Sequence, residues 1–136
     1  MSVEATIGIA NSALTAQSQR ITLIAQNLAN ADSVSSPDGG PYQRRIPVFE
    51  AEDMGDGANG GAGVKLAAVM KDNALPHEVF DPSNPFADAN GVVKEPNVDP
   101  VYEMVDMMQA ARSYQANLSV IQSAHSAAIK TLDLLK

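Results

Sequence analysis

Two long stretches that lack helix-breaking residues lie at the ends of the chain, and they constrain its fold more than any other feature. Residues 1–31 and 100–136 contain one glycine, Gly8, and one proline, Pro100, which suits a first helical position. In the first stretch apolar side chains recur every seven residues, at Ile7, Leu14, Ile21 and Leu28, and a companion series follows at Ala10, Gln17, Ile24 and Ala31. This heptad pattern predicts a helix from about Val3 to Ala31, about 42 Å long.

A second long helix is predicted to begin at Pro100. Asp99 is a good N-cap, and the acidic Glu103 favours the positive end of a helix. Three series spaced by seven residues run through this segment: Met104, Ala111, Leu118, His125 and Leu132; Val101, Met108, Gln115, Gln122 and Ile129; and Met107, Tyr114, Ile121, Ala128 and Leu135. The apolar face is therefore wide, which indicates partners on more than one side.

The expected fold is mainly α with a small β-rich insertion, and the two terminal helices are expected to pair as an antiparallel coiled-coil-like hairpin. We expect one structural unit with an N-terminal helix at 1–31, a middle region at 32–99 and a C-terminal helix at 100–136. Two helices alone leave much apolar surface exposed, so assembly with other subunits is the physical expectation. The expected packing residues, some within the chain and others between chains, are Ile7, Leu14, Ile21 and Leu28 against Met104, Met108, Ala111, Leu118 and Leu132.

The middle region has the composition of turns and short strands. Residues 33–41 are rich in turn-forming residues, and 50–63, acidic and then glycine-rich, predict a flexible exposed loop. Extended segments are expected at 42–49, 64–71 and 77–80, the first at a sheet edge because it contains Pro47. Asn90-Gly91, followed by Val92-Val93-Lys94, predicts a hairpin turn.

The charge and the composition exclude several functions. The net charge of −7 comes entirely from residues 32–99, which argues against a nucleic-acid partner, since phosphates need a basic surface. There is no cysteine and there are two histidines, His77 and His125, so no metal or cofactor site is expected. No segment reaches the ~18 apolar residues of a membrane span. The N-terminus lacks a cleavable signal sequence, which predicts a cytoplasmic protein or export without cleavage.

The motifs that suggest catalysis or binding are weak. Residues 55–60 match G-x-G-x-x-G, but an acidic stretch precedes them and a strand follows, so a flexible loop is expected there. Glu50, Glu52 and Asp53 offer paired carboxylates, but no apolar pocket is expected to raise the pKa of one of them for general acid chemistry. Arg44-Arg45, the one basic cluster, suits pairing with acids of a neighbouring subunit or solvation, of which we favour solvation. We expect no enzyme activity and no small-molecule substrate.

A resemblance to a known family begins at the end of the first helix. Asn27-Leu28-Ala29-Asn30-Ala31-Asp32-Ser33 resembles the N-terminal signature of bacterial flagellar rod and hook axial proteins. Further segments are similar to the proximal rod members of this family: 13–20, 40–42, 48–49, 87–91, 93–94, 96–99, 103–107 and 112–117. The resemblance covers nearly the whole chain, and several motifs in the right order are more specific than any one of them.

The resemblance implies a structural subunit of the flagellar basal-body rod, the drive shaft that transmits motor torque to the hook and filament. Its implied partners are other copies of itself and other rod proteins in a helical tubular assembly, together with the flagellar type III export apparatus. The implied location is the periplasm-spanning rod, reached without a cleaved signal peptide. The alternative is a soluble helical chaperone or adaptor of the export system, which the acidic charge suits but the β-rich insertion and the rod motifs do not.

Overall fold

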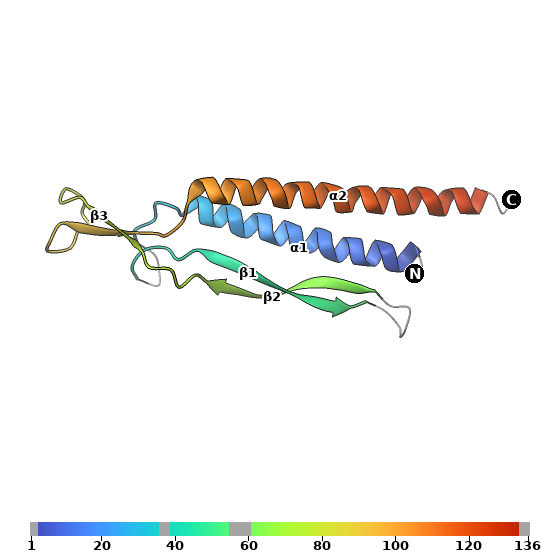
Figure 1. Ribbon diagram of the computed structural model, residues 1–136, viewed down its shortest axis with the longest axis horizontal. Coiled ribbons are helices and arrows are strands. Elements are labelled where there is room, and N and C mark those ends of the chain that lie inside the picture. Colours follow the sequence, from blue (N-terminus) through green and yellow to red (C-terminus); the bar gives the residue numbers. More distant parts are fainter. Residues whose placement is uncertain (1–2, 36–38, 55–60, 134–136) are drawn as a thin grey trace.

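The computed structural model describes residues 3–35, 39–54 and 61–133. Its elements, in chain order, are α1 (Val3–Ala29), β1 (Arg45–Asp53), β2 (Ala62–Lys71), β3 (His77–Phe80), β4 (Val92–Glu95) and α2 (Pro100–Asp133). The two helices run side by side in opposite directions, and α1 lies between α2 and the β1–β2 hairpin (Figure 1). The β3–β4 pair lies beyond the end of the helices at which α2 begins. The expectation of two terminal helices around a small β insertion is confirmed.

The ends of the helices follow the sequence signals. Asp99 caps α2, because its Oδ1 accepts a hydrogen bond from the backbone N–H of Val101 at 2.8 Å. The last helical residue of α1 is Ala29, and a turn follows in which the backbone N–H of Asn30 donates to the carbonyl oxygen of Gln26 at 3.1 Å. With 34 residues against 27, α2 is about 10 Å longer than α1 at 1.5 Å per residue, and its C-terminal end extends past α1 (Figure 1).

The β1–β2 hairpin is longer than the sequence pattern predicts. Its antiparallel register pairs Arg45 with Lys71 at one end and Asp53 with Ala62 at the other, with an irregularity after Val48. The prediction of a flexible loop over 50–63 is therefore wrong for residues 50–53 and 62–63, because pairing with the opposite strand extends both strands. Residues 54 and 61 lie outside both strands, and the backbone N–H of Met54 donates to the carbonyl oxygen of Gly61 at 3.0 Å. Residues 55–60, which hold the G-x-G-x-x-G motif, lie outside the described residues. Pro47 is tolerated because a two-stranded sheet has only edge strands.

A close backbone contact attaches this hairpin to α1. Ser12 Oγ accepts a hydrogen bond from the backbone N–H of Val64 at 3.0 Å and donates one to the carbonyl oxygen of Ile9 at 2.7 Å. The neighbouring Gly63 is buried, and a Cβ at this position would lie 2.7 Å from Cγ of Met54 and 2.8 Å from Ser12 Oγ. The strand therefore approaches the helix as closely as only glycine permits.

The connection between β3 and β4 is longer than the sequence predicts. His77 pairs with Glu95 and Phe80 with Val92, so residues 81–91 form the connection. The hairpin predicted from Asn90-Gly91 is present, but these two residues end the longer connection and do not form it alone, and Gly91 has a φ of +75°. The connection is built on Asp88, whose carboxylate accepts backbone N–H bonds from Asn90 and Val92 at 2.8 and 2.9 Å. These bonds, that from Val92 foremost, lower the pKa of Asp88 below its ordinary value.

The buried core is small and is built mostly from aliphatic residues. Its members are Ala10, Ala16, Leu23, Ile24, Ala31, Val93, Val98 and Ala110. Three members of the companion heptad series, Ala10 and Ile24 on α1 and Ala31 in the turn after it, are buried more deeply than the series that begins at Ile7, whose members are half-buried. Over its described residues, neither helix carries an apolar stretch long enough to cross a membrane.

Candidate functional site

Asn27, in the last turns of α1, is the centre of a buried polar junction. Only 1% of its surface is exposed. Its Oδ1 accepts hydrogen bonds from the Tyr42 hydroxyl at 2.9 Å and from the backbone N–H of Arg45 at 2.8 Å. Its Nδ2 donates to the carbonyl oxygen of Arg45 at 3.0 Å and to Glu103 Oε2 at 3.1 Å. An asparagine side chain offers two donors and one oxygen with two lone pairs, so its hydrogen-bonding capacity is fully used.

The second half of the junction is a set of ion pairs that joins α1, α2 and Arg44, the residue before β1. Glu103 on α2 is 1% exposed and accepts a bond from Arg44 Nε through Oε1. Arg44 Nη2 also lies 3.6 Å from Asp106 Oδ2, and Arg20 Nη2 on α1 lies 3.6 Å from Asp106 Oδ1. A carboxylate this deeply buried needs such partners, since an unpaired buried charge is strongly destabilising. The expected solvation of the arginine pair is therefore wrong for Arg44, which is neutralised within the chain.

Tyr42 lies in the segment that leads into β1, and its hydroxyl is bonded to Asn27. Its pKa is raised above the ordinary value of 10.0, mainly because burial disfavours the phenolate. The positive charge of Arg45 opposes the rise, and the negative charge of Glu103 adds to it. The neutral hydroxyl is thus the form that the junction holds, and it is the form that can donate to Asn27 Oδ1.

The remaining residues of the family motif, Leu28 to Ala31, shape the turn after α1. Asn30 Nδ2 donates to the carbonyl oxygen of Gln26 at 2.8 Å, and its Oδ1 accepts from Ser33 Oγ at 3.1 Å. Ala31 is buried, Leu28 is half-buried and Ala29 is exposed. The motif residues therefore serve different contacts: Asn27 joins three elements, whereas Asn30 fixes the local turn.

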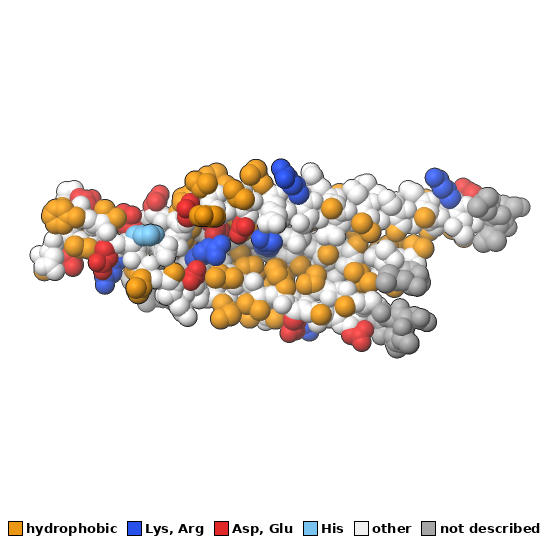
Figure 2. Space-filling model, viewed as in Figure 1, with side chains coloured by type: hydrophobic (Ala, Val, Ile, Leu, Met, Phe, Trp, Pro, Cys, Tyr) orange, Lys and Arg blue, Asp and Glu red, His pale blue; other side chains and the backbone are white. Residues whose placement is uncertain are grey.

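The packing residues expected from the heptads fall into two groups. Within the single chain the α1 members Ile7, Leu14, Ile21 and Leu28 are half-buried, whereas the α2 members Met104, Met108, Ala111, Leu118 and Leu132 are all exposed. Met108 is 55% exposed and Leu118 40%. In the single chain the predicted α2 members are therefore left largely open to solvent. Figure 2 shows hydrophobic side chains gathered on the surface over the first turns of α2.

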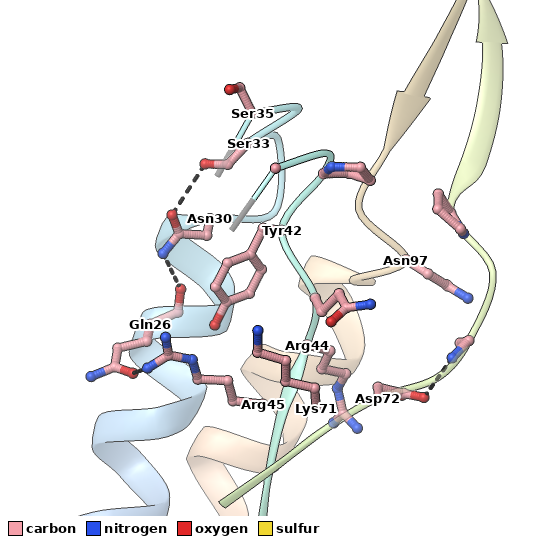
Figure 3. Close-up of a pocket in the computed structure, with 15 residues that line it drawn as sticks. Gln26, Asn30, Ser33, Ser35, Tyr42, Arg44, Arg45, Lys71, Asp72 and Asn97 are labelled. Carbon is pink, nitrogen blue, oxygen red and sulfur yellow. Dashed lines mark hydrogen bonds between the residues drawn. The ribbon is translucent and has the colours of Figure 1, made fainter. Parts of the chain in front are cut away.

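A polar hollow of about 680 Å³ opens beside the junction, between the end of α1, the start of β1 and the end of β2. Figure 3 shows Arg44, Arg45, Lys71 and Asp72 around it, with Tyr42 on its α1 side. Three of its lining residues are cations and one is an acid. In the described part of the chain no three His, Cys, Asp or Glu side chains gather closely enough to hold a metal ion.

Sequence patterns alone did not reveal the junction. The sequence pattern predicts a helix-start acid at Glu103 and a solvated cation at Arg44, and their separation of 59 positions gives no periodic signal. The sequence feature that could have revealed the junction is the low number of charges in residues 1–31 and 100–136. Arg20, Glu103 and Asp106 are among those few charges. Charges placed on otherwise neutral helices are expected to pair, and Arg20, Glu103 and Asp106 do so.

The sequence of this chain is similar to the sequences of known flagellar rod proteins. Residues 89–134, which contain β4 and α2, match the family described as flagellar basal body rod FlgEFG protein, C-terminal. Over 126 residues the chain is 52% identical to the flagellar basal-body rod protein FlgC of Salmonella typhimurium, which covers 93% of this chain and 92% of that protein.

Two further relatives give the same result. The FlgC protein of Escherichia coli O157:H7 is 53% identical over 126 residues, 93% of this chain and 92% of that protein. The FlgC protein of Buchnera aphidicola from Schizaphis graminum is 40% identical over 136 residues, 98% of each chain. The chain belongs to the FlgC family of flagellar basal-body rod proteins. It is a structural subunit of the flagellum, which confirms the resemblance, and the export-adaptor alternative is not favoured.

Proposed function

We propose that this chain is a mechanical subunit of the proximal rod, the part of the drive shaft nearest the motor, and that it assembles with other copies of itself and with other rod proteins into a helical tube. Family membership makes the chain a rod subunit, and its assembly into a helical tube is the part that we propose. In it, the two antiparallel helices act as a coiled-coil-like pair that contributes to the wall of the tube. Catalysis is not part of the proposal.

The observation that carries the proposal is the exposed apolar stripe on one side of α2. We define the stripe as Met104, Met108, Ala111, Leu118 and Ile129. The spacing of its members places them on one flank of the helix, next to the face that α1 covers. An apolar surface of this length is unfavourable in water, so it is expected to be covered by another subunit.

Leu132 adds a second reason to expect a partner. It is 64% exposed and belongs to the last turns of α2, beyond the end of α1 (Figure 1). The helix pair therefore ends in an unmatched segment that a neighbouring chain can continue. Contacts that differ on the two partners and do not close into a ring produce a helical filament.

Small side chains suit the proposed mechanical role. The buried residues of α1 and α2 include Ala10, Ala16 and Ala110, which allow helix axes to approach closely. Densely packed interiors have low compressibility and transmit strain. A shaft that carries torque needs such stiffness within each subunit and between subunits. On this proposal the chain reaches the rod through the flagellar type III export apparatus.

The test is to follow the chain into detergent-resistant basal bodies in a strain that lacks its own copy. The wild-type chain and Leu118→Asp are produced at equal levels, and Gln109→Asp is the matched control. Gln109 is exposed and lies nine residues, or two and a half turns, from Leu118, on the opposite side of α2. We expect the wild type and the control in basal bodies, and Leu118→Asp outside them, because a charge would enter a packed seam. Normal incorporation of Leu118→Asp would contradict the proposal.

A further inference from the structure

The β3–β4 pair with its connection, residues 77–95, displays an aromatic side chain that the chain does not cover. We call these residues the tip. Phe80 ends β3 and is 73% exposed, although its ring lies against the backbone of the connection: a Cβ at Gly91 would be 3.1 Å from Phe80 Cε2. The connection is held by its own hydrogen bonds, since Asp81 Oδ1 accepts the backbone N–H of Ser83 at 3.1 Å. An aromatic ring that is held in place and left in water is typical of an anchor for a partner.

Glu78 gives the same face of β3 a negative charge. Alternate side chains of a strand share a face, so Glu78 and Phe80 lie on one face, about 6.6 Å apart along the strand. Glu78 is exposed and makes no ion pair within the described residues, although Lys94 lies opposite it in the register. Residues 77–95 are all described and hold four acids against this one lysine. The tip is therefore acidic even when Lys94 is counted.

The first part of the α2 stripe carries groups that complement these two. Met108 is 55% exposed, and Arg112 follows it by four residues, so the two lie on one side of α2, about 6 Å apart. The Arg112 side chain is exposed, and in the part of the chain that the structure describes it makes no ion pair. No acid stands three or four residues from it along the helix, where a neutralising partner would be expected.

The two surfaces match in both chemistry and spacing. A ring and a carboxylate on β3 are about 6.6 Å apart, and a methionine and a guanidinium on α2 are about 6 Å apart. Methionine sulfur makes favourable contacts with aromatic rings, and a guanidinium forms charge-assisted hydrogen bonds with a carboxylate. The tip lies beyond the end of the helices at which α2 begins (Figure 1). The tip of one copy can therefore reach the α2 stripe of a copy that is displaced along the long axis.

We propose that the tip of one copy docks on the first part of the α2 stripe of the next copy, with Phe80 against Met108 and Glu78 beside Arg112. This inference rests on the proposed function, because it names the partner that covers this part of the stripe. Such a contact joins two different surfaces of the same chain and repeats from copy to copy.

The small size of this contact limits what it does. A stable interface buries about 800 Å² on each partner, and one aromatic side chain buries at most about 250 Å². The docking therefore sets the register between copies that the remainder of the stripe already holds together. We do not expect it to hold two copies together in dilute solution.

Charge exchange tests the docking. Glu78→Arg and Arg112→Glu each bring like charges together, so we expect each variant to fold normally by circular dichroism but to enter basal bodies about tenfold less than the wild type. The chain with both substitutions restores the pair in the opposite sense and is expected to recover to within about twofold of the wild type. Unaffected single variants would overturn the docking. A double variant no better than the single variants would overturn it too, because the partner would then not be a second copy.

Removal of the ring tests the apolar half of the contact. Phe80→Ser is expected to enter basal bodies about tenfold less than the wild type, because Met108 loses the ring that covers it. Met70→Ser is the matched control, since Met70 is 55% exposed on β2 and belongs to neither surface. We expect the control to stay within about twofold of the wild type. Equal losses in the two variants would overturn the role of Phe80.

Cross-linking separates a failure of the docking from a failure of the proposed function. The natural chain has no cysteine, so one strain can produce two chains with a single cysteine each, Glu78→Cys and Arg112→Cys, and a link between them joins two copies. We expect a short thiol-specific cross-linker to join these chains in basal bodies. The control pairs Glu78→Cys with Lys130→Cys, an exposed position about 27 Å further along α2, and is expected to give no link.

The outcomes of the cross-linking differ for the two proposals. Basal bodies that contain both single-cysteine chains without the link would overturn the docking and leave the proposed function intact. A wild-type chain absent from basal bodies would overturn both.

Discussion

Asn27 and Glu103 are 76 positions apart in the sequence, yet Asn27 Nδ2 donates to Glu103 Oε2 at 3.1 Å, and both side chains are almost completely buried. This contact joins the end of α1 to the beginning of α2. Asn27 also makes two hydrogen bonds to the backbone of Arg45, and these attach the β1–β2 hairpin to the place where the two helices meet. The three layers of the molecule are therefore fastened together at one end.

Replacement of Asn27 by Ala is expected to destabilise the chain by about 2–4 kcal/mol, because several buried groups lose their partners and each such loss costs about 1–3 kcal/mol. Urea unfolding followed by circular dichroism measures the change in the free energy of unfolding. Asn11→Ala is the control on the same helix, since Asn11 is exposed, and it is expected to change stability by less than about 0.5 kcal/mol. Equal effects of the two substitutions would show that the junction does not stabilise the fold.

The junction is expected to weaken at high pH. The folded-state pKa of Tyr42 lies above its unfolded value of 10.0, so the folded state holds this proton more tightly. The stabilisation is complete below pH 10 and is lost as the pH rises through the folded-state pKa. In Tyr42→Phe the free energy of unfolding should fall less steeply above pH 10 than in the wild type. Tyr102→Phe, at an exposed tyrosine, should retain the wild-type pH dependence.

Two glycines next to Met54 are expected to respond in opposite ways to substitution by alanine. Gly63→Ala brings a Cβ to 2.7 Å from Met54 Cγ and should destabilise the chain by about 1–3 kcal/mol. Gly8→Ala meets Met54 Cε at an ordinary 3.5 Å and should stabilise α1 by up to about 1 kcal/mol through helix propensity. Thermal unfolding of the two variants gives the signs directly. A stabilised Gly63→Ala would mean that β2 does not approach α1 closely.

One buried polar atom offers a way to stabilise the chain. Gln17 Oε1 is buried and has no hydrogen-bond partner among the described residues. Gln17→Met keeps the size of the side chain and removes the unsatisfied acceptor, so we expect the free energy of unfolding to rise by about 1 kcal/mol. Gln19→Met, at an exposed position of the same helix, serves as the control and should leave stability nearly unchanged. A destabilised Gln17→Met would indicate that the oxygen has a partner in solution.

The helices could be predicted from sequence because their signals are local and long. Four heptads without an internal proline leave few alternatives for α1, and Asp99 with Pro100 marks the start of α2 within a residue. The depth of burial was less predictable. The companion series of α1 is buried more deeply than the Ile7 series, and a heptad pattern does not indicate where a third layer, here the β1–β2 hairpin, packs against the helix.

The middle region and the junction depend on contacts between distant residues. Glu50 to Asp53 have the composition of an acidic loop, and they form a strand only because β2 pairs with them. The family resemblance pointed to Asn27 without indicating its partners. Those partners lie at Tyr42, Arg45 and Glu103, and only the folded chain brings them together.

The central claim is that the α2 stripe is exposed in the single chain and covered in the rod. Methionine oxidation by dilute peroxide, read by mass spectrometry, measures this directly, because Met104 and Met108 lie on the stripe and both are exposed. In the purified chain the two methionines should oxidise as readily as the exposed Met70 of β2. In isolated basal bodies we expect their oxidation to slow by about tenfold or more, as burial in a packed interface requires. Equal oxidation rates of Met108 in the free chain and in basal bodies would contradict the account.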